Sequence, residues 1–195
     1  MDKLTSIIVA GVGGQGTILA GRLLGDVALR KGLDVKVSEV HGMSQRGGSV
    51  VTYVRYGEKV YSPMTEAGEA DYLIAFEELE AARWINLLKK GGVAVVDCNR
   101  IPPAPVLAGT AEYPDGIPER LAGFDIGFYR VDALTLAKEA GFTKAANVAL
   151  MGAFAAVSEL GYETCIKSIE YVLSGRFLDE NIRAFRAGYD SARSI

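Results

Sequence analysis

The stretch SIIVAGVGGQGT, residues Ser6–Thr17, decides the fold. Its first part, Ser6–Ala10, is a short apolar and β-branched run, which is typical of a parallel strand buried on both faces. Gly11, Gly13 and Gly16 then give the pattern G-x-G-x-x-G, and apolar residues at helical spacing follow over Thr17–Lys31. Strand, glycine loop and helix in this order predict the opening of a Rossmann-like α/β sheet.

The glycine loop has the composition of an anion-binding turn. Glycines let the backbone turn tightly and let N–H groups approach an anion at the start of the next helix. Glu39 lies at the end of a second predicted strand, Asp34–Val40, about where a dinucleotide fold places its ribose-binding carboxylate. A nicotinamide-dependent dehydrogenase using this loop and Glu39 is one interpretation. A tight turn without a ligand is another, and the bulky Gln15 inside the loop counts against a dinucleotide.

A second polar loop, HGMSQRGG at residues His41–Gly48, follows the second strand. The carboxyl ends of parallel strands meet at one edge of an open sheet, so we expect this loop beside the glycine loop. Arg46 can hold a carboxylate or phosphate through two hydrogen bonds, and His41, the only histidine, can exchange a proton. The alternative is a solvated surface loop, because no acid and nucleophile lie close enough to His41 to suggest a catalytic triad.

The middle of the chain alternates between strand and helix signals. Strands are expected at Ser49–Tyr56, Asp71–Phe76, Val93–Asp97 and, more weakly, Gly127–Val131. Gly57-Glu58 offers a tight reversal, so Lys59–Ser62 is expected to pair with the strand before it in a β-hairpin. A helix is predicted over Glu77–Lys90.

The last third of the chain reads as helical. Helical patterns cover residues 133–140, 146–160, 163–174 and 178–194. The second of these is apolar nearly all round, so it should be buried. Before them, residues 101–118 hold five of the six prolines and predict a rigid irregular connection. We therefore expect one α/β domain over residues 1–195: a Rossmann-like open, mostly parallel sheet with a β-hairpin insertion and a helical C-terminal third.

Composition excludes several classes of function. With 21 Lys and Arg against 24 Asp and Glu, the net charge of −3 argues against binding to nucleic acid or to an anionic membrane. Hydrophobic residues make up 49% of the chain, and with glycine the apolar share exceeds that of an average soluble domain, which indicates apolar surface for a partner. The longest apolar run, Val148–Val157, is too short to span a bilayer. Without a signal peptide at its start, the chain is expected in the cytoplasm.

Few residues can support redox or metal chemistry. The two cysteines, Cys98 and Cys165, are far apart in sequence and cannot supply an iron–sulfur cluster or a structural zinc site with a single histidine. A disulfide framework is likewise not expected. We therefore expect no metal and no cofactor bound by this chain alone.

Several longer motifs resemble one family. GVGGQG at 11–16, SEVHGMSQRGGSV at 38–50 and YSPM at 61–64 resemble the gamma-type domain of the 2-oxoacid:ferredoxin oxidoreductases. Later signatures agree: GEAD at 68–71, IPP at 101–103, ANV at 146–148 leading to Gly152, and Phe185-x-x-Gly188. The resemblance runs from Ile7 to about Tyr189. The string HGMSQRGG favours the aryl-pyruvate (indolepyruvate) branch, since other branches tend to carry a different string before RGG.

The resemblance implies an oxidoreductase subunit. The resemblance implies that the holoenzyme decarboxylates an aryl-pyruvate in anaerobic amino-acid catabolism, passes the acyl group to coenzyme A and reduces ferredoxin. Thiamine diphosphate, Mg²⁺ and the [4Fe-4S] clusters belong to a larger alpha subunit in this family. The chain lacks a thiamine-type GDG motif and cluster cysteines, so it is expected to be the smaller subunit and inactive alone.

The resemblance also implies a set of site residues. His41, Gln45 and Arg46 are candidates for contact with the partner's thiamine site or with coenzyme A. The expected anion-binding or partner-facing residues are Gly11, Gly13, Gly14, Gln15, Gly16, Thr17, Glu39, Ser44, Gly47, Gly48 and Asn147. A purely structural subunit contact is the alternative for both loops, and no catalytic base is assigned. A small-anion-binding regulatory module, a gamma subunit of another branch and a homodimer of the isolated chain stay open.

Overall fold

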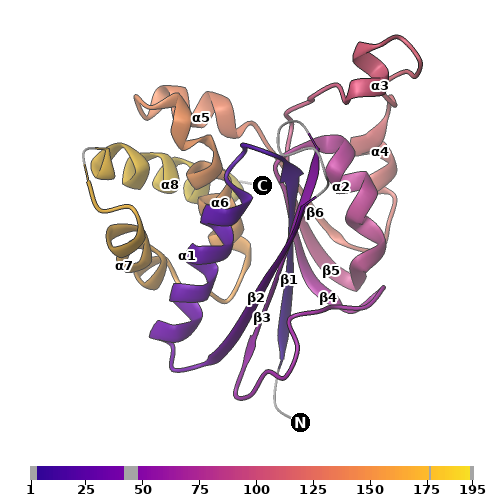
Figure 1. The fold of residues 1–195 in the computed structure, drawn as a ribbon. Helices are drawn as coiled ribbons and strands as arrows, with labels where there is room; N and C mark the ends of the chain where they lie inside the picture. Colours follow the sequence, from indigo (N-terminus) through magenta and orange to yellow (C-terminus); the bar gives the residue numbers. More distant parts are fainter. Residues whose placement is uncertain (1–3, 42–47, 176, 194–195) are drawn as a thin grey trace.

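One sheet carries helices on both of its faces (Figure 1). The computed structural model describes residues 4–41, 48–175 and 177–193, and of His41 it describes only the backbone. The strands are β1 (Thr5–Val12), β2 (Asp34–His41), β3 (Ser49–Gly57), β4 (Ala70–Ala75), β5 (Leu88–Asp97) and β6 (Gly127–Val131). The helices are α1 (Thr17–Arg30), α2 (Glu78–Trp84), α3 (Ala104–Leu107), α4 (Ile117–Ala122), α5 (Ala133–Glu139), α6 (Ala146–Val157), α7 (Tyr162–Val172) and α8 (Leu178–Arg193), with 3₁₀ turns at Ile85–Leu87 and Thr143–Ala145.

The strand order is β2-β3-β1-β4-β5-β6. β1, β4, β5 and β6 are parallel, whereas β3 is antiparallel to both β1 and β2. β2 therefore runs in the same direction as β1 but lies one strand further out. The expected Rossmann-like, mostly parallel open sheet is confirmed.

The β-hairpin is not the one that the sequence predicted. β2 and β3 form it, with Asp34 opposite Gly57 and His41 opposite Val50. The expected strand Lys59–Ser62 is wrong, because β3 pairs along its length with β1 on its other side and has no free edge to offer. The segment after β3 runs as an irregular connection instead, and the Arg55 guanidinium donates to the carbonyl oxygens of Ser62 and Met64.

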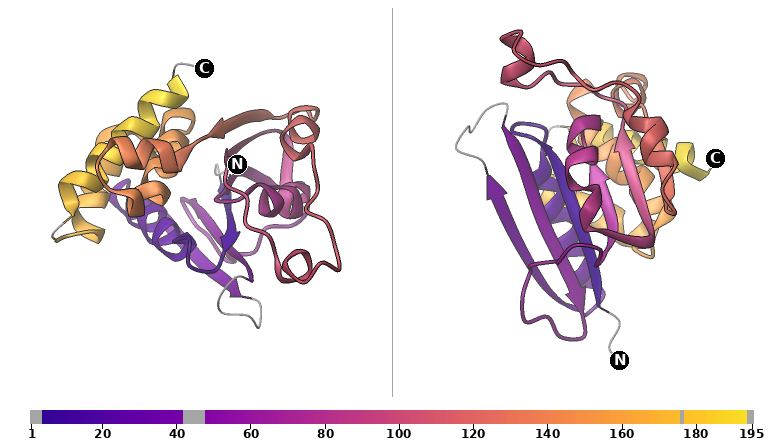
Figure 2. Two further views of the ribbon diagram at one scale, coloured as in Figure 1. Left: turned by 90° about the horizontal axis from the view of Figure 1, so that it is seen from above. Right: turned by 90° about the vertical axis from the view of Figure 1, so that its right-hand side faces the viewer.

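Helices lie on both sides of the sheet (Figure 2), and each face has an apolar core of its own. The α1 face is covered by α1, α5, α6, α7 and α8, and its largest fully buried side chains include Phe154 and Phe185. The α2 face is covered by α2 and α4, with Leu73 and Val96 in its core. Every residue of β1 is buried, as expected for a central strand covered on both faces.

The predicted helix Glu77–Lys90 is shorter than expected. α2 ends at Trp84, a 3₁₀ turn follows, and β5 already begins at Leu88. Leu88 is buried opposite Ala70 of β4, and Lys89 forms an ion pair with Asp71. The helical pattern in the sequence continues past Trp84 to Lys90. Pairing of Leu88 with β4 overrides this pattern and ends the helix early.

The predicted buried helix is α6, which lies against α8. A Cβ on Gly152 would overlap the carbonyl oxygen of Phe185, and a Cβ on Gly188 would overlap that of Ala149. The two backbones therefore touch at these glycines. This contact explains why the sequence carries glycine at both positions.

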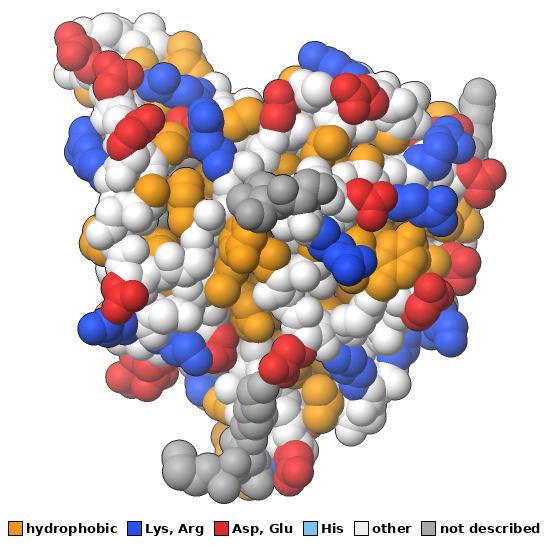
Figure 3. All heavy atoms as spheres, turned by 180° about the vertical axis from the view of Figure 1, so that it is seen from behind, with side chains coloured by type: hydrophobic (Ala, Val, Ile, Leu, Met, Phe, Trp, Pro, Cys, Tyr) orange, Lys and Arg blue, Asp and Glu red, His pale blue; other side chains and the backbone are white. Residues whose placement is uncertain are grey.

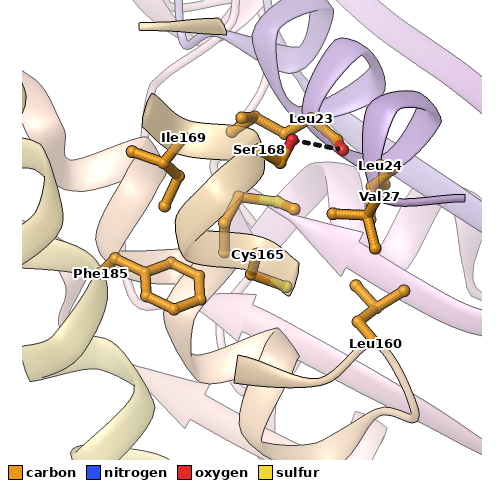
Figure 4. A pocket seen from close by; sticks show the side chains of 9 residues that line it. Leu23, Leu24, Val27, Leu160, Cys165, Ser168, Ile169 and Phe185 are labelled. Carbon is orange, nitrogen blue, oxygen red and sulfur yellow. Dashed lines mark hydrogen bonds between the residues drawn. The ribbon is translucent and has the colours of Figure 1, made fainter. Parts of the chain in front are cut away.

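A small void lies in the core of the α1 face (Figure 4). Its volume is about 10 Å³, which is no more than a single water needs. Ser168 lines it and donates a hydrogen bond to the Leu23 carbonyl oxygen at 3.1 Å. The void is a packing defect and is too small for a ligand.

Candidate functional site

The glycine loop joins β1 to α1 with a backbone that only glycine adopts easily. Gly14 and Gly16 have φ angles of 100° and 92°, in the left-handed region that disfavours residues with a Cβ. Gly16 is the N-cap of α1 and offers no side chain to cap it. Thr17, the first residue of α1, is buried. The loop thus opens α1 through backbone geometry alone.

Gln15 fixes the loop to two strands. The Val12 N–H donates to Gln15 Oε1 at 2.7 Å, and Gln15 Nε2 donates to the carbonyl oxygen of Phe76 at 2.7 Å. Phe76 directly follows β4, and its own N–H donates to the Ala10 carbonyl oxygen at 2.9 Å. The bulky amide that counted against a dinucleotide therefore bridges the carboxyl ends of β1 and β4.

Asn147 closes the other side of the loop. It lies in the first turn of α6, where its Oδ1 accepts from the Val148 N–H at 2.9 Å. Its Nδ2 faces Gly16 so closely that a Cβ on Gly16 would overlap it. The N-termini of α1 and α6 thus meet, which concentrates the positive ends of two helix dipoles beside the glycine loop.

The second loop reaches the same edge of the sheet. The Gly13 N–H donates to the Gly48 carbonyl oxygen at 3.0 Å, just before β3 begins. The expected convergence of the two loops is confirmed for these residues. Ser44, Gln45, Arg46 and Gly47 lie outside the described residues, as does the side chain of His41.

Glu39 does not join this site. It is opposite Thr52 of β3, which in turn is opposite Val9 in the middle of β1. Two strand spacings, roughly 10 Å, therefore separate Glu39 from β1. It lines instead a groove of about 590 Å³ on the α1 face with Gly21 and Tyr171. A dinucleotide fold needs its ribose-binding acid on the strand next to β1, and β3 occupies that place.

A group of buried acids, which the sequence analysis missed, continues the edge beyond β4. Glu77 is 1% exposed, and its carboxylate accepts from the N–H groups of Glu80 at 2.8 Å and Ile101 at 3.0 Å and from the Tyr113 hydroxyl. Glu78 is also buried and accepts from Arg130 Nε at 3.1 Å and Nη2 at 2.8 Å. Both buried carboxyl groups therefore have hydrogen-bond partners, and Glu78 also has an ion pair with Arg130.

Asp97, the last residue of β5, is the third of these acids. It is 5% exposed, and burial raises its pKa to about 6. The Ala133 N–H donates to its Oδ1 at 3.3 Å. The signal in the sequence was acids at the ends of predicted strands: EELE at 77–80 directly follows one strand, and Asp97 is the last residue of another.

The described residues offer little to a metal or a membrane. They contain no group of three or more His, Cys, Asp or Glu that could hold a metal ion. None of their helices combines the length and the apolar run needed to cross a bilayer. Cys98 is half-buried, and burial raises its pKa, while burial raises the pKa of Cys165 to about 12. Neither thiol is poised as a thiolate.

Comparisons with known proteins agree with the resemblance seen in the motifs. The family described as pyruvate ferredoxin/flavodoxin oxidoreductase matches residues 6–191. The indolepyruvate oxidoreductase subunit IorB of Thermococcus kodakarensis is 43% identical over 99% of this chain and 98% of its own length. The corresponding subunit of Pyrococcus horikoshii is 41% identical, again over 99% and 98%.

A solved structure supports the fold, and a relative from another branch of the family allows the sequence identities to be compared. The gamma subunit of a keto/oxoacid ferredoxin oxidoreductase from Geobacter sulfurreducens superposes with a TM-score of 0.73, covering 98% of this chain and 99% of its own, at 24% identity. The 2-oxoglutarate synthase subunit KorC of Methanothermobacter marburgensis is 31% identical over 93% of both chains. Identity is therefore higher toward the indolepyruvate relatives than toward this other branch.

Proposed function

The chain belongs to the pyruvate ferredoxin/flavodoxin oxidoreductase family, and we propose that it is the small subunit of an indolepyruvate ferredoxin oxidoreductase. Full-length identity of 43% to an indolepyruvate oxidoreductase subunit, against 31% to a 2-oxoglutarate synthase subunit, supports this branch over the others. The motif HGMSQRGG at 41–48 points in the same direction.

The reaction is the oxidative decarboxylation of an aryl-pyruvate. The bond between the carboxylate and the keto carbon breaks, carbon dioxide leaves, and a thioester forms between the acyl group and coenzyme A. Two electrons pass to ferredoxin, and a proton is released. Thiamine diphosphate, Mg²⁺ and [4Fe-4S] clusters supply this chemistry from a larger subunit, and we place the complex in the cytoplasm.

The observation that carries the proposal for the site is the hydrogen bond from the Gly13 N–H to the Gly48 carbonyl oxygen. It joins the two motif loops at the carboxyl edge of the sheet, beside the N-termini of α1 and α6. We assign this edge to the partner's active-site cleft or to the phosphates of coenzyme A. The described residues of this edge are Gly11, Gly13, Gly14, Gln15, Gly16, Thr17, Gly48 and Asn147. From the motif alone we add Ser44 and Gly47 to the site, with His41, Gln45 and Arg46 as candidates for contact with the reacting groups.

The alternatives from other classes lack such support. A nicotinamide-dependent dehydrogenase needs Glu39 next to the glycine loop, and β3 separates them. A stand-alone small-anion sensor does not account for similarity to oxidoreductase subunits over the whole chain.

Co-expression with the candidate large subunit tests the function. Purified complex should reduce ferredoxin or a viologen dye anaerobically, only when indolepyruvate and coenzyme A are both present and only with both chains. Arg46→Ala and Gln45→Ala should weaken assembly, coenzyme A affinity or turnover. Arg22→Ala, at an exposed arginine of α1, is the matched control. Unchanged behaviour of the Arg46 and Gln45 variants would remove the loop from the site, and NAD binding by the isolated chain would overturn the function.

A further inference from the structure

An arm of residues 101–112 stands out from the carboxyl edge of the sheet (Figures 1 and 2). It contains α3, and neither core cluster includes any of its residues. In the space-filling view the arm projects at the upper left, with a notch between it and the rest of that edge (Figure 3).

The tip of the arm is apolar and exposed. The eleven residues IPPAPVLAGTA at 101–111 include no charged side chain, although 23% of the whole chain is charged. Leu107 is 76% exposed. Pro102, Ala104, Pro105 and Ala108 are exposed as well, so the tip presents several apolar side chains in one stretch. A contiguous exposed apolar stretch of this kind is typical of a surface that a partner covers.

Local hydrogen bonds hold the tip of the arm. Within the tip, the N–H groups of Leu107 and Ala108 donate to the carbonyl oxygens of Pro103 at 3.1 Å and Ala104 at 2.9 Å. The Thr110 N–H returns to the Pro105 carbonyl oxygen at 2.9 Å. Prolines add stiffness because they fix φ. An interface element that is ordered beforehand loses less conformational entropy when it binds.

One buried carboxylate closes the base of the arm. Glu77 accepts from the Ile101 N–H at 3.0 Å, where the arm begins, and from the Tyr113 hydroxyl, just after the arm ends. The Arg100 guanidinium lies 4.3 Å from the centre of the Tyr113 ring and donates to Asp115 at 3.2 Å. The arm is thus a loop whose two ends are tied to the same buried group.

The base of the arm connects directly to the glycine loop. Glu77 follows Phe76, and the Phe76 carbonyl oxygen accepts from Gln15. The arm and the glycine loop therefore rise from the same edge of the sheet through adjacent residues. A single partner that covers the glycine loop is therefore also close to the base of the arm.

We propose that the arm is a docking element whose tip, centred on Leu107, enters an apolar pocket of the large thiamine- and iron–sulfur-binding subunit. The inference rests on the proposed function, because that function assigns the glycine-loop edge to this partner. A second copy of the chain is the competing occupant. The large subunit is favoured because the arm is continuous with the edge that faces it.

The test measures binding of the large subunit to variants of the small subunit. Leu107→Asp and the uncharged Leu107→Gln should each weaken binding at least about tenfold, as expected for an anchor residue at an interface. The matched control is Leu29→Asp in α1, since Leu29 is also largely exposed, at 62%, but lies away from the arm. All three variants should keep the melting temperature of the isolated wild-type chain, because their side chains are exposed.

The outcomes separate the two proposals. If the wild type binds the large subunit and both Leu107 variants bind equally well, the arm is not the docking element and the proposed function stands. If the Leu107 variants only dissociate a homodimer of the isolated chain, the occupant is a second copy and the inference is wrong. If the wild type does not bind the large subunit at all, both proposals fail.

Discussion

Gly16 and Asn147 meet at the junction of two helix N-termini. The Asn147 amide lies where a side chain on Gly16 would have to be, and Gly16 also has a φ of 92°. Two motifs far apart in the sequence are therefore parts of one structure. The contact fixes how α6 approaches the glycine loop.

Replacement of Gly16 by alanine should destabilise the chain through two separable effects. The left-handed backbone costs about 1–2 kcal/mol for a residue with a Cβ, and the clash with Asn147 adds to it. Gly14→Ala is the matched control, because Gly14 has a φ of 100° and nothing within 4 Å of a Cβ. Urea denaturation should show a larger loss in the free energy of unfolding for Gly16→Ala than for Gly14→Ala. Adding Asn147→Ala to Gly16→Ala should remove the extra loss, because it removes the clash. Equal losses for the two glycines would contradict the contact.

Gln15→Glu should expose the role of the bridging amide. The substitution keeps an acceptor for the Val12 N–H but places an ionised oxygen against the Phe76 carbonyl, 2.7 Å from the present amide nitrogen. An unmade buried hydrogen bond of this kind costs about 1–3 kcal/mol. A protonated carboxyl can donate again. The Phe76 carbonyl raises the pKa of the new carboxyl in the folded chain, so the loss should shrink as the pH falls toward the ordinary glutamate pKa of about 4.3 and be smallest below it. Gln15→Ala should show no such recovery in denaturation curves across pH.

Gly188→Ala should destabilise the contact between α6 and α8 strongly. Its Cβ would overlap the Ala149 carbonyl oxygen and lie 3.1 Å from the Ala153 nitrogen, and these are backbone atoms of α6. Separating the helices should cost about 3 kcal/mol or more. Gly25→Ala in α1 is the control, since its Cβ would lie 3.7 Å from a Val37 methyl and should gain up to about 1 kcal/mol from helix propensity. If Gly188→Ala and Gly25→Ala changed the free energy of unfolding in the same direction, the packing argument would be refuted.

Asp97→Asn should stabilise the chain at neutral pH but not in acid. Burial raises the pKa of Asp97 from 3.8 to about 6 in the folded chain. The folded state therefore binds the proton more tightly, and stability falls as the pH rises from about 4 to about 6. The variant keeps an acceptor for the Ala133 N–H and removes this loss, for a gain of about 1–3 kcal/mol at pH 7. Urea denaturation of both proteins across pH tests this. If the difference in free energy of unfolding between Asp97→Asn and wild type stayed the same from about pH 4 to pH 7, the buried-charge explanation would be wrong.

The sequence by itself determined the elements whose pattern is local. The run from Ser6 to Thr17 set β1, the loop and α1, because strand, glycine turn and helical spacing each extend over a few neighbours. The apolar stretch around Leu150 identified α6 as a buried helix. The motifs also identified the family, since HGMSQRGG and GVGGQG are long enough to be specific.

Only the tertiary structure decided which strands pair and which distant residues meet. The insertion of β3 between β1 and β2 moved Glu39 away from the glycine loop, and strand pairing depends on contacts between segments that no local pattern encodes. The same holds for the end of α2, which pairing of Leu88 with β4 cut short. The closure of the arm at Glu77 likewise joins Ile101 and Tyr113 only in the folded chain, because a buried carboxylate must find its donors wherever the packed chain places them.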